Sequence, residues 1–288
     1  MLIDTHAHLD YADFAADFEE ILARAHAAEV TRVITIGTSL ESSRHAVELA
    51  EKHDSVFAVI GVHPTAADEA DDDVMTPLRE LARSKRVVAI GETGLDYHRL
   101  PSAEARDEQK SQDVSRALQA ETEQEVEAGL HDGAYKAKQA SLFEQQLDLA
   151  AELGLNVVIH QRDAWDDTLA LLQPYTGKLR GVFHCFGGSI DQAREVLAAG
   201  HLVSFTGIVT FKNGATVREV AAQLAPGEFM VETDCPYLAP VPFRGKRCEP
   251  AYTRLVAECI AEARGVSLEE IARQTTATAE GFFRFHAK

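Results

Sequence analysis

Short apolar segments alternate with longer amphipathic segments along almost the whole chain. The apolar segments are nearly continuous and rich in valine, isoleucine and phenylalanine, which is typical of strands buried on both faces of a parallel sheet. The pattern predicts eight such strands, at residues 2–8, 32–36, 56–61, 87–92, 157–160, 181–184, 202–205 and 229–234.

The amphipathic segments carry apolar residues at helical spacing. They predict helices at residues 14–29, 39–53, 73–85, 142–153, 164–172, 190–199 and 215–224, and three more at 251–264, 267–274 and 277–285. Eight parallel strands that alternate with helices close most economically into an α/β fold of the (β/α)8 TIM-barrel type, here with extra C-terminal helices. A length of 288 residues fits one barrel, so we predict a single domain over residues 1–288.

An acidic insert interrupts the alternation after the fourth predicted strand. It spans approximately residues 100–137, which is far longer than an ordinary loop between a strand and a helix. Residues 102–128 hold eight acidic side chains against three basic ones, with few apolar residues. Either a projecting helical arm or a disordered segment fits this composition. We expect residues 103–134 to lie outside the barrel and to be dispensable for its chemistry.

Composition and charge restrict the class of protein. Hydrophobic residues make up 45% and charged residues 26% of the chain, as in ordinary globular proteins. No apolar run approaches the ~20 residues of a membrane span and no signal segment precedes the first strand, so we expect a cytoplasmic protein without a membrane partner. The net charge of -18 argues against loose electrostatic binding of nucleic acid, although bound cations can dominate a local site.

The four cysteines show neither a C-x-x-C pair nor a regular spacing; they are Cys185, Cys235, Cys248 and Cys259. This pattern indicates neither a thiolate zinc site nor a disulfide framework. Cys185 and Cys235 directly follow candidate site residues within predicted strands. We therefore expect both thiols to face away from the site and to pack as small hydrophobic groups.

Side chains that can bind a metal stand at the carboxyl ends of six predicted strands. His6 and His8 follow the first strand two residues apart, so their side chains share a face. The third, fourth, fifth, sixth and eighth strands end at His63, Glu92, His160, His184 and Asp234. Singly, such a histidine is usually a hydrogen-bonded structural residue and such a carboxylate a helix cap. Together they indicate a metal site, because the carboxyl ends of barrel strands meet at one rim.

The donor types restrict the metal. Neutral imidazoles with carboxylates suit Zn²⁺, Mn²⁺ or Mg²⁺ and do not suit an iron–sulfur or soft-metal site. Most other histidines lie in predicted helices, in the insert or at the beginning of a strand, and we expect these to be surface residues: His26, His45, His53, His131, His201 and His286.

The stretch Gly91-Glu92-Thr93-Gly94-Leu95-Asp96-Tyr97 resembles the signature of the TatD family of metal-dependent hydrolases, within the amidohydrolase superfamily. Further stretches extend the resemblance in order along the chain, at residues 4–8, 61–64, 160–164, 184–186, 232–238 and 244–247. Superfamily relatives often carry a carboxylated lysine on the fourth strand. Here that place holds Glu92, which favours the TatD branch.

The resemblance implies a centre with two divalent metal ions. His6, His8 and Asp234 would hold the first ion, His160 and His184 would hold the second, and Glu92 would bridge the two. Two ions ~3.5–4 Å apart can activate one water molecule between them, and Asp234 would accept its proton. Glu92 and Asp234 are therefore the predicted catalytic residues. The role of Asp96 stays open between orienting a ligand and capping the loop.

Basic residues also follow strand ends, namely Arg162, Lys212, Arg244, Lys246 and Arg247. They are either solvated loop residues or a clamp for a phosphodiester, for which the guanidinium group is well suited. We assign them to substrate binding together with His63, which the resemblance places near the site either as a phosphate contact or in a structural role.

Two positions depart from the family pattern. The family usually has His or Tyr before Arg-Gly-Lys-Arg and Asn after it, whereas this chain has Phe243 and Cys248. Phe243 can still stack on a base, but Cys248 lacks a hydrogen-bonding amide. The substitutions put the placement of the substrate in doubt and leave the metal ligands untouched.

The function that the resemblance implies is a TatD-type deoxyribonuclease, an exonuclease that removes nucleotides from single-stranded DNA ends, with RNA open as a further substrate. The partner would be nucleic acid and the protein a monomer. Two alternatives stay open. The same site could hydrolyse esters or amides, as in an aminoacyl-tRNA deacylase, or the chain could be a metal-binding scaffold without catalysis.

Overall fold

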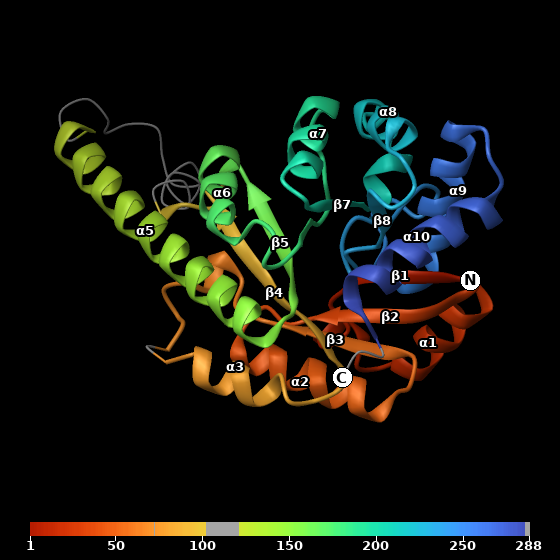
Figure 1. Ribbon diagram of the computed structural model, residues 1–288, viewed down its shortest axis with the longest axis horizontal. Helices are drawn as coiled ribbons and strands as arrows, with labels where there is room; N and C mark the ends of the chain where they lie inside the picture. The colour runs from red at the N-terminus through yellow and green to blue at the C-terminus, as the bar shows by residue number, and fades with distance from the viewer. Residues whose placement is uncertain (72, 102–120, 286–288) are drawn as a thin grey trace, which may run out of the picture.

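The computed structural model describes residues 1–71, 73–101 and 121–285. Within these ranges eight parallel strands form one sheet in the order of the sequence (Figure 1). They are β1 (Leu2–Ala7), β2 (Val30–Ile36), β3 (Val56–Ile60), β4 (Val87–Asp96), β5 (Asn156–Arg162), β6 (Gly181–Phe183), β7 (Leu202–Phe205) and β8 (Phe229–Val231). The predicted strands are thus confirmed, and β4 continues to Asp96 beyond its predicted end.

Contacts between the first and last strands close the sheet into a barrel. Ala7 and Cys235 form a parallel bridge, and the backbone N–H of Asp234 donates to the carbonyl oxygen of His6 at 2.8 Å. Below them, the buried carboxylate of Asp4 accepts hydrogen bonds from the backbone N–H of Thr233 at 3.0 Å and from its hydroxyl at 2.6 Å. The (β/α)8 TIM-barrel prediction is confirmed.

The described helices surround the barrel (Figure 1). They are α1 (Phe18–Ala27), α2 (Leu40–Lys52), α3 (Met75–Leu81), α5 (Glu121–Leu153), α6 (Trp165–Leu172), α7 (Ile190–Ala198), α8 (Ala215–Gln223), α9 (Thr253–Arg264) and α10 (Leu268–Phe283). The two helices predicted at residues 267–274 and 277–285 form the single helix α10. Threonine is tolerated there because the hydroxyl of Thr275 donates to the carbonyl oxygen of Ile271 at 2.9 Å.

The barrel interior is apolar below the rim. One buried cluster takes at least one residue from every strand, including Ile34, Val158 and Met230, and joins them to Phe282 and Phe283 of α10. A larger cluster contains the alternate strand residues and the inner faces of the helices. The end of α10 therefore closes the amino end of the barrel, and the carboxyl end is left for polar side chains.

The predicted insert lies partly outside the described residues, which exclude residues 102–120. Helix α5 begins at Glu121, within the predicted insert, and not near residue 138. The amino-terminal part of α5 projects beyond the barrel (Figure 1), and residues 129–134 are largely exposed. From Tyr135 onward the helix packs on the barrel, and the Tyr135 hydroxyl donates to the carbonyl oxygen of Thr65 at 2.9 Å. None of the helices in the described ranges has the length and apolar character needed to cross a membrane.

His201 is buried, contrary to the expectation of a surface residue. It precedes β7 with 2% of its surface exposed, and its Nδ1 accepts a hydrogen bond from the backbone N–H of Gly181 at 2.9 Å. The sequence pattern at a strand's beginning did not reveal that α7 and β6 cover this position. Burial, aided by the positive charge of Arg180, lowers the pKa of His201 to about 4.

We expect that replacing residues 103–134 with a short glycine–serine linker leaves the fold intact, because residues 129–134 of α5 are largely exposed and Tyr135 is buried against the barrel. Circular dichroism, thermal unfolding and metal content of the purified variant would check this. A variant without Tyr135 as well should lose stability. Loss of folding in the shorter deletion would show that the insert belongs to the structural core.

We expect His201→Gln to make the protein less sensitive to mild acid. The folded-state pKa of about 4 lies below the ordinary value of 6.5, so the contribution of His201 to stability is complete above pH 6.5 and is lost as the pH falls toward 4. Glutamine keeps an acceptor for the Gly181 N–H and does not titrate. Urea unfolding at several pH values would measure the difference, with the exposed His26→Gln as control. Parallel pH profiles for wild type and His201→Gln would contradict the assignment.

Candidate metal centre

The carboxyl ends of the strands surround a cavity of about 1340 Å³. Its lining includes six of the predicted site residues that carry imidazole or carboxylate groups, namely His8, His63, Glu92, His160, His184 and Asp234. His6 lies beneath them and is fully buried. The structure therefore brings the predicted metal ligands together at one rim, as expected from their positions at strand ends.

Four donor atoms gather on one side of the cavity. His6 Nε2 lies 3.3 Å from His8 Nε2, 3.4 Å from Glu92 Oε2 and 3.7 Å from Asp234 Oδ1. His8 Nε2 lies 3.3 Å from Asp234 Oδ1. Donors around one tetrahedral ion with bonds of ~2.0–2.1 Å stand ~3.3–3.4 Å apart. The spacing of these atoms therefore fits a metal ion.

A second group of donors faces the other oxygen of Glu92. Oε1 lies 2.8 Å from His184 Nε2 and 2.9 Å from His160 Nδ1, and these two nitrogens are 3.4 Å apart. The two oxygens of Glu92 are thus divided between the two groups. This is the arrangement that a carboxylate between two ions requires.

The outer nitrogens of His8 and His160 are held by acceptors. His8 Nδ1 lies 3.2 Å from the carbonyl oxygen of Ile36, which can only accept, so His8 Nδ1 carries the proton and Nε2 keeps its lone pair. His160 Nε2 lies 3.2 Å from Asp96 Oδ2. The other oxygen of Asp96 accepts from the backbone N–H of His98 at 2.9 Å. Asp96 therefore caps the loop and also orients His160, so it has both of the roles that the sequence left open.

His63 has the opposite orientation. Its Nδ1 accepts from the backbone N–H of Thr65 at 3.1 Å, so in the neutral ring the proton resides on Nε2. Nε2 points toward Glu92 Oε1 at 3.5 Å. Although His63, Glu92 and His160 are close enough to hold an ion, a protonated Nε2 donates and does not ligate. This orientation suits a hydrogen bond to a phosphate oxygen.

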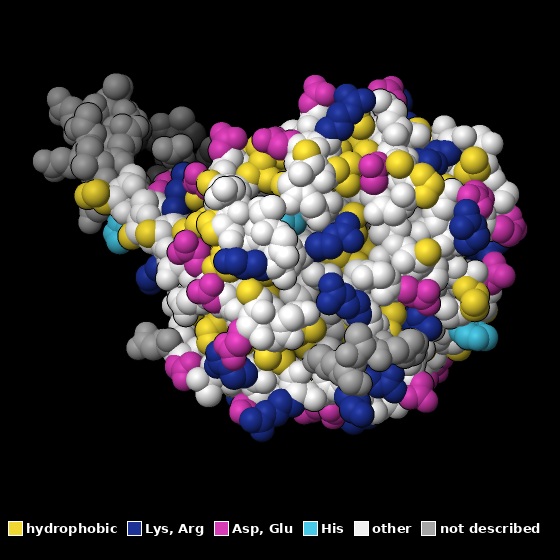
Figure 2. Space-filling view, viewed as in Figure 1, with side chains coloured by type: hydrophobic (Ala, Val, Ile, Leu, Met, Phe, Trp, Pro, Cys, Tyr) yellow, Lys and Arg dark blue, Asp and Glu magenta, His cyan; other side chains and the backbone are white. Residues whose placement is uncertain are grey.

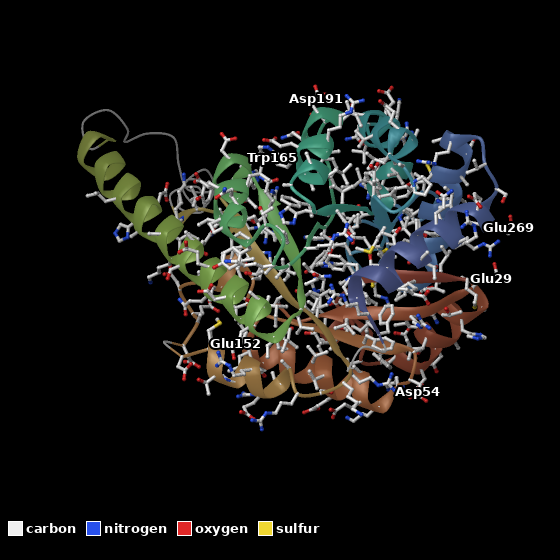
Figure 3. The ribbon with its side chains drawn as sticks, viewed as in Figure 1. Glu29, Asp54, Glu152, Trp165, Asp191 and Glu269 are labelled. Atoms are coloured by element: carbon white, nitrogen blue, oxygen red, sulfur yellow. The ribbon has the colours of Figure 1, made fainter. Side chains whose placement is uncertain are left out.

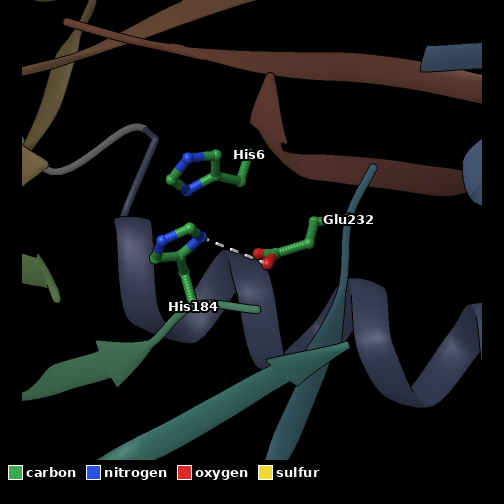
Figure 4. A group of neighbouring side chains, drawn as sticks. All are labelled: His6, His184 and Glu232. Atoms are coloured by element: carbon green, nitrogen blue, oxygen red, sulfur yellow. Dashed lines mark ion pairs between the residues drawn. The ribbon is translucent and has the colours of Figure 1, made fainter. Parts of the chain in front are cut away.

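Glu232 is a residue of the centre that the sequence analysis missed. Its carboxylate is buried, accepts hydrogen bonds from the Cys185 N–H at 2.7 Å and the Ser204 hydroxyl at 2.5 Å, and faces His184 Nδ1 at 3.6 Å (Figure 4). Among the described residues, His184 Nδ1 has no hydrogen-bond partner at standard distance, so Glu232 is its nearest anion. A signal was present, because Glu232 directly follows the apolar strand β8 and stands two residues before Asp234.

Glycines allow β4 to approach β5 closely at the centre. Gly94 has φ +141°, and a Cβ there would lie 2.0 Å from the carbonyl oxygen of His160. A Cβ on Gly91, with φ +145°, would lie 2.6 Å from the carbonyl oxygen of Val158. The two glycines around Glu92 thus let its strand lie close enough for contact with His160.

Two buried glutamines of α5 hold the ends of β3 and β4 from behind. Gln146 accepts from the Val62 N–H at 2.8 Å and donates to the Thr93 hydroxyl at 2.7 Å. Gln139 accepts from the Asp96 N–H at 2.9 Å and donates to the Asp96 carbonyl oxygen at 3.1 Å. Their side chains fix the backbone on either side of Glu92.

The electrostatics of the centre favour ionised carboxylates. Burial opposes the charge of Glu92, but His184, His63 and His160 outweigh it and hold the Glu92 pKa well below its ordinary value. Burial likewise opposes ionisation of Asp234, and the hydrogen bond with His8 together with neighbouring imidazoles keeps the Asp234 pKa lowered. Anionic carboxylates among imidazoles are a donor set that suits divalent cations. The residues present fit the metal ions that the sequence implies.

The predicted basic residues are divided in space. Arg162 is exposed and lines the cavity, whereas Lys212 lines a separate hollow beside α8 and α9. Arg247 forms a bidentate ion pair with Asp17 at 2.7 and 2.8 Å. Arg244 lies over the ring of Phe211 and Lys246 over that of Phe243. Phosphate contacts by these residues stay a prediction.

The two departures from the family pattern are built into the packing. Phe243 stacks on Tyr252 with ring centroids 4.4 Å apart, and Cys248 is fully buried. Cys235 is also fully buried, as expected. Cys185, in contrast, lines the cavity, so the expectation for its thiol was wrong. The strand ends at Phe183, and Cys185 lies in the following turn with φ +49°, where strand alternation no longer applies.

Known proteins similar to this chain share its full length. The sequence profile of the family described as TatD related DNase matches residues 3–284. The chain is 37% identical over 287 residues to the uncharacterized metal-dependent hydrolase YabD of Bacillus subtilis, which covers 99% of this chain and 100% of that protein. It is 33% identical over 289 residues to the 3'-5' ssDNA/RNA exonuclease TatD of Pantoea ananatis, with 98% and 99% covered.

A solved structure has the same fold. The crystal structure of YJJV, a TatD homolog from Escherichia coli K12, superposes with a TM-score of 0.81 at 26% sequence identity and covers 98% of each chain. The whole barrel is therefore shared, including the rim on which the candidate ligands stand.

We expect Glu232→Gln to bind metal about 10- to 100-fold more weakly, the usual effect of removing a partner of a ligating histidine. Glutamine can still accept from the Cys185 N–H but offers His184 no negative charge. Competition with a chromophoric chelator would measure the affinity without any turnover. The control is Glu249→Gln, which alters another buried glutamate, one that pairs with Arg24 at 2.7 Å. Equal affinities in the two variants would show that Glu232 does not support the centre.

Proposed function

The chain belongs to the family of TatD related DNases, and from this membership and the geometry of its rim we propose that it hydrolyses phosphodiester bonds at the ends of single-stranded DNA, with two divalent ions as cofactors. Members of this family are metal-dependent hydrolases, so the chain is a hydrolytic enzyme that acts on ester bonds. The relative from Pantoea ananatis is named for action on single-stranded DNA and RNA, which motivates the choice of substrate.

The observation that carries the proposal is the division of the Glu92 carboxylate. Oε2 faces His6 at 3.4 Å, whereas Oε1 faces His184 at 2.8 Å and His160 at 2.9 Å. A structural ion would need one closed set of ligands. Two sets that share one carboxylate and open on a cavity are suited to hydrolysis.

The metal ions, when bound, would polarise the phosphodiester and lower the pKa of a water molecule. His6, His8 and Asp234 would hold one ion, His160 and His184 the other, and Glu92 would contact both. Asp234 has the second task of proton acceptor. Its lowered pKa keeps it ionised at neutral pH, and it lines the cavity three residues after the end of β8.

His63 would contribute a hydrogen bond to the phosphate. Its Nε2 carries the proton because Nδ1 accepts from Thr65, and the ring lines the cavity beside Glu92. A donor directed at oxygens that gain charge stabilises the transition state more than the ground state.

The surface carries acidic side chains at several separate places. Glu29, Asp54, Asp191 and Glu269 project from the periphery of the molecule (Figure 3). On the face shown in Figure 2, lysine and arginine side chains are interspersed with acidic ones and form no single patch. Arg162 lines the cavity, and we propose that it meets a phosphate of the substrate.

We expect Asp234→Asn to retain metal and to lose about 10²–10⁴-fold in kcat on a DNA oligonucleotide, because an amide can ligate weakly but cannot accept a proton at neutral pH. His184→Ala should instead lose one ion, and added Mn²⁺ should restore part of the activity. Metal analysis and initial rates would separate the two effects.

The same assay identifies the substrate class. Chelator-stripped wild type should recover DNA cleavage when a divalent metal is returned. An aminoacyl-tRNA ester is the second substrate to be tested. Cleavage of the ester alone would replace the nuclease by an ester hydrolase on the same site, and inactivity on both with two ions bound would favour a scaffold.

We expect Arg162→Ala to raise KM for an oligonucleotide and to weaken its salt dependence, with a loss of slope of roughly 0.7 for each phosphate contact removed from a single strand. Arg247→Ala is the matched variant, since its guanidinium is paired with Asp17. The sequence-based prediction that Arg247 contacts a phosphate requires the same rise in KM and loss of salt dependence in Arg247→Ala. An unchanged KM and salt slope would assign either arginine to structure only.

A further inference from the structure

Two tyrosines stand beside the metal centre, each three residues after a proposed ligand. Tyr11 follows His8, and Tyr237 follows Asp234. A turn fixes each of them, because the N–H of Tyr11 donates to the carbonyl oxygen of His8 at 3.2 Å and that of Tyr237 to the carbonyl oxygen of Asp234 at 2.9 Å. Both side chains line the cavity. The backbone that places the ligands therefore also places the two rings.

The rings form a corner that opens on the cavity. Tyr11 stacks on the imidazole of His8 with centroids 4.9 Å apart and an interplanar angle of 21°. Tyr237 stands nearly perpendicular to Tyr11, at 6.2 Å and 82°. Tyr237 is 54% exposed, unusual for so large a ring on a fixed backbone turn. The rings of Tyr11 and Tyr237 thus lie edge to face beside His8, a proposed ligand of the metal centre.

The charges of the cavity wall indicate whether a ligand would be attracted by charge or by stacking on the tyrosine rings. Apart from the metal centre, the wall carries four carboxylates and two guanidinium groups, from Glu69, Asp163, Asp166, Asp167, Arg99 and Arg162. A phosphate-bearing ligand gains little attraction from such a wall. A planar aromatic group can instead stack on one tyrosine and meet the other edge-on, which is independent of charge.

Two other large aromatic side chains of the cavity are less available. The hydroxyl of Tyr97 donates to Asp167 at 2.7 Å, and Lys136 lies over its ring. Trp165 lines the wall at the start of α6, but its Nε1 donates to Glu195 at 3.0 Å and its ring packs against Phe183 and Phe186. The corner of Tyr11 and Tyr237 is therefore the better stacking surface.

We propose that Tyr11 and Tyr237 form a seat for the nucleobase next to the scissile phosphate. This inference rests on the proposed nuclease function and adds a physical origin for its choice of single strands. A base that is paired and stacked in a duplex cannot enter the corner, whereas the unpaired base of a strand end can. The seat recognises any base, since every base has a stacking face.

The test compares two phosphates that differ only in the base. Thymidine 5'-monophosphate and 2-deoxyribose 5-phosphate are titrated into the metal-loaded protein by calorimetry, so that no turnover is needed. Wild type should prefer the nucleotide by about 5- to 150-fold, the range that base stacking on an aromatic side chain provides. Tyr237→Ala should reduce this ratio toward one, and Tyr237→Phe, which keeps the ring, should preserve it. Tyr175→Ala is the matched control, because Tyr175 lies in the turn before β6 and pairs with Asp148.

Each outcome decides the proposal. The proposal is wrong if wild type binds the nucleotide and the sugar phosphate with equal affinity. It is also wrong if the ratio of the two affinities is the same in wild type and Tyr237→Ala. If oligonucleotide cleavage accompanies that result, the nuclease function stands without the seat. If the ratio depends on Tyr237 but no oligonucleotide is cleaved, the seat stands and the proposed function fails.

Discussion

The rim of this barrel depends on the burial of one carboxylate. Glu92 is 3% exposed, and a buried anion is costly unless it is paired. Imidazole nitrogens of four histidines lie within 3.5 Å of its oxygens, from His6, His63, His160 and His184. These residues come from four strands or their exits. The buried carboxylate is therefore stabilised only when β1, β3, β5 and β6 all end at the same level. The ionised state of Glu92 thus depends on the closed barrel.

Support for this arrangement comes from behind the strands. Gln139 and Gln146 of α5 are fully buried and bond to the backbone at the ends of β4 and β3. The same helix begins in the acidic insert and ends at β5. Residues 121–137 of the predicted insert thus belong to a helix that positions the centre. A deletion that extends to Tyr135 would remove a side chain that packs on the barrel.

The sequence was sufficient for the architecture and for the residues at strand ends. His6 and His8, for example, follow a short apolar strand, and their shared face needs only the alternation of a strand. Glu232 was missed because its role depends on the turn at Cys185, where alternation stops. The glutamines of α5 could not be found either, since a buried glutamine on a helix has no sequence signal without its backbone partner. The pairing of Arg247 with Asp17 joins residues far apart in the chain, and no spacing reveals it.

The positions of the proposed metal ligands are more constrained by the barrel than the positions in the turns that follow the strands. The ligands stand on strands or on the first residues after them, where the barrel fixes the backbone. The outer nitrogens of His8 and His160 are held by Ile36 and Asp96, and Glu232 lies 3.6 Å from that of His184. The groups available to a substrate stand on the turns beyond. Phe243 stacks on Tyr252, and Cys248 is buried. Substitutions in these turns therefore alter the recognition of a substrate before they alter the binding of metal, as expected for a fold that varies its loops around a constant rim.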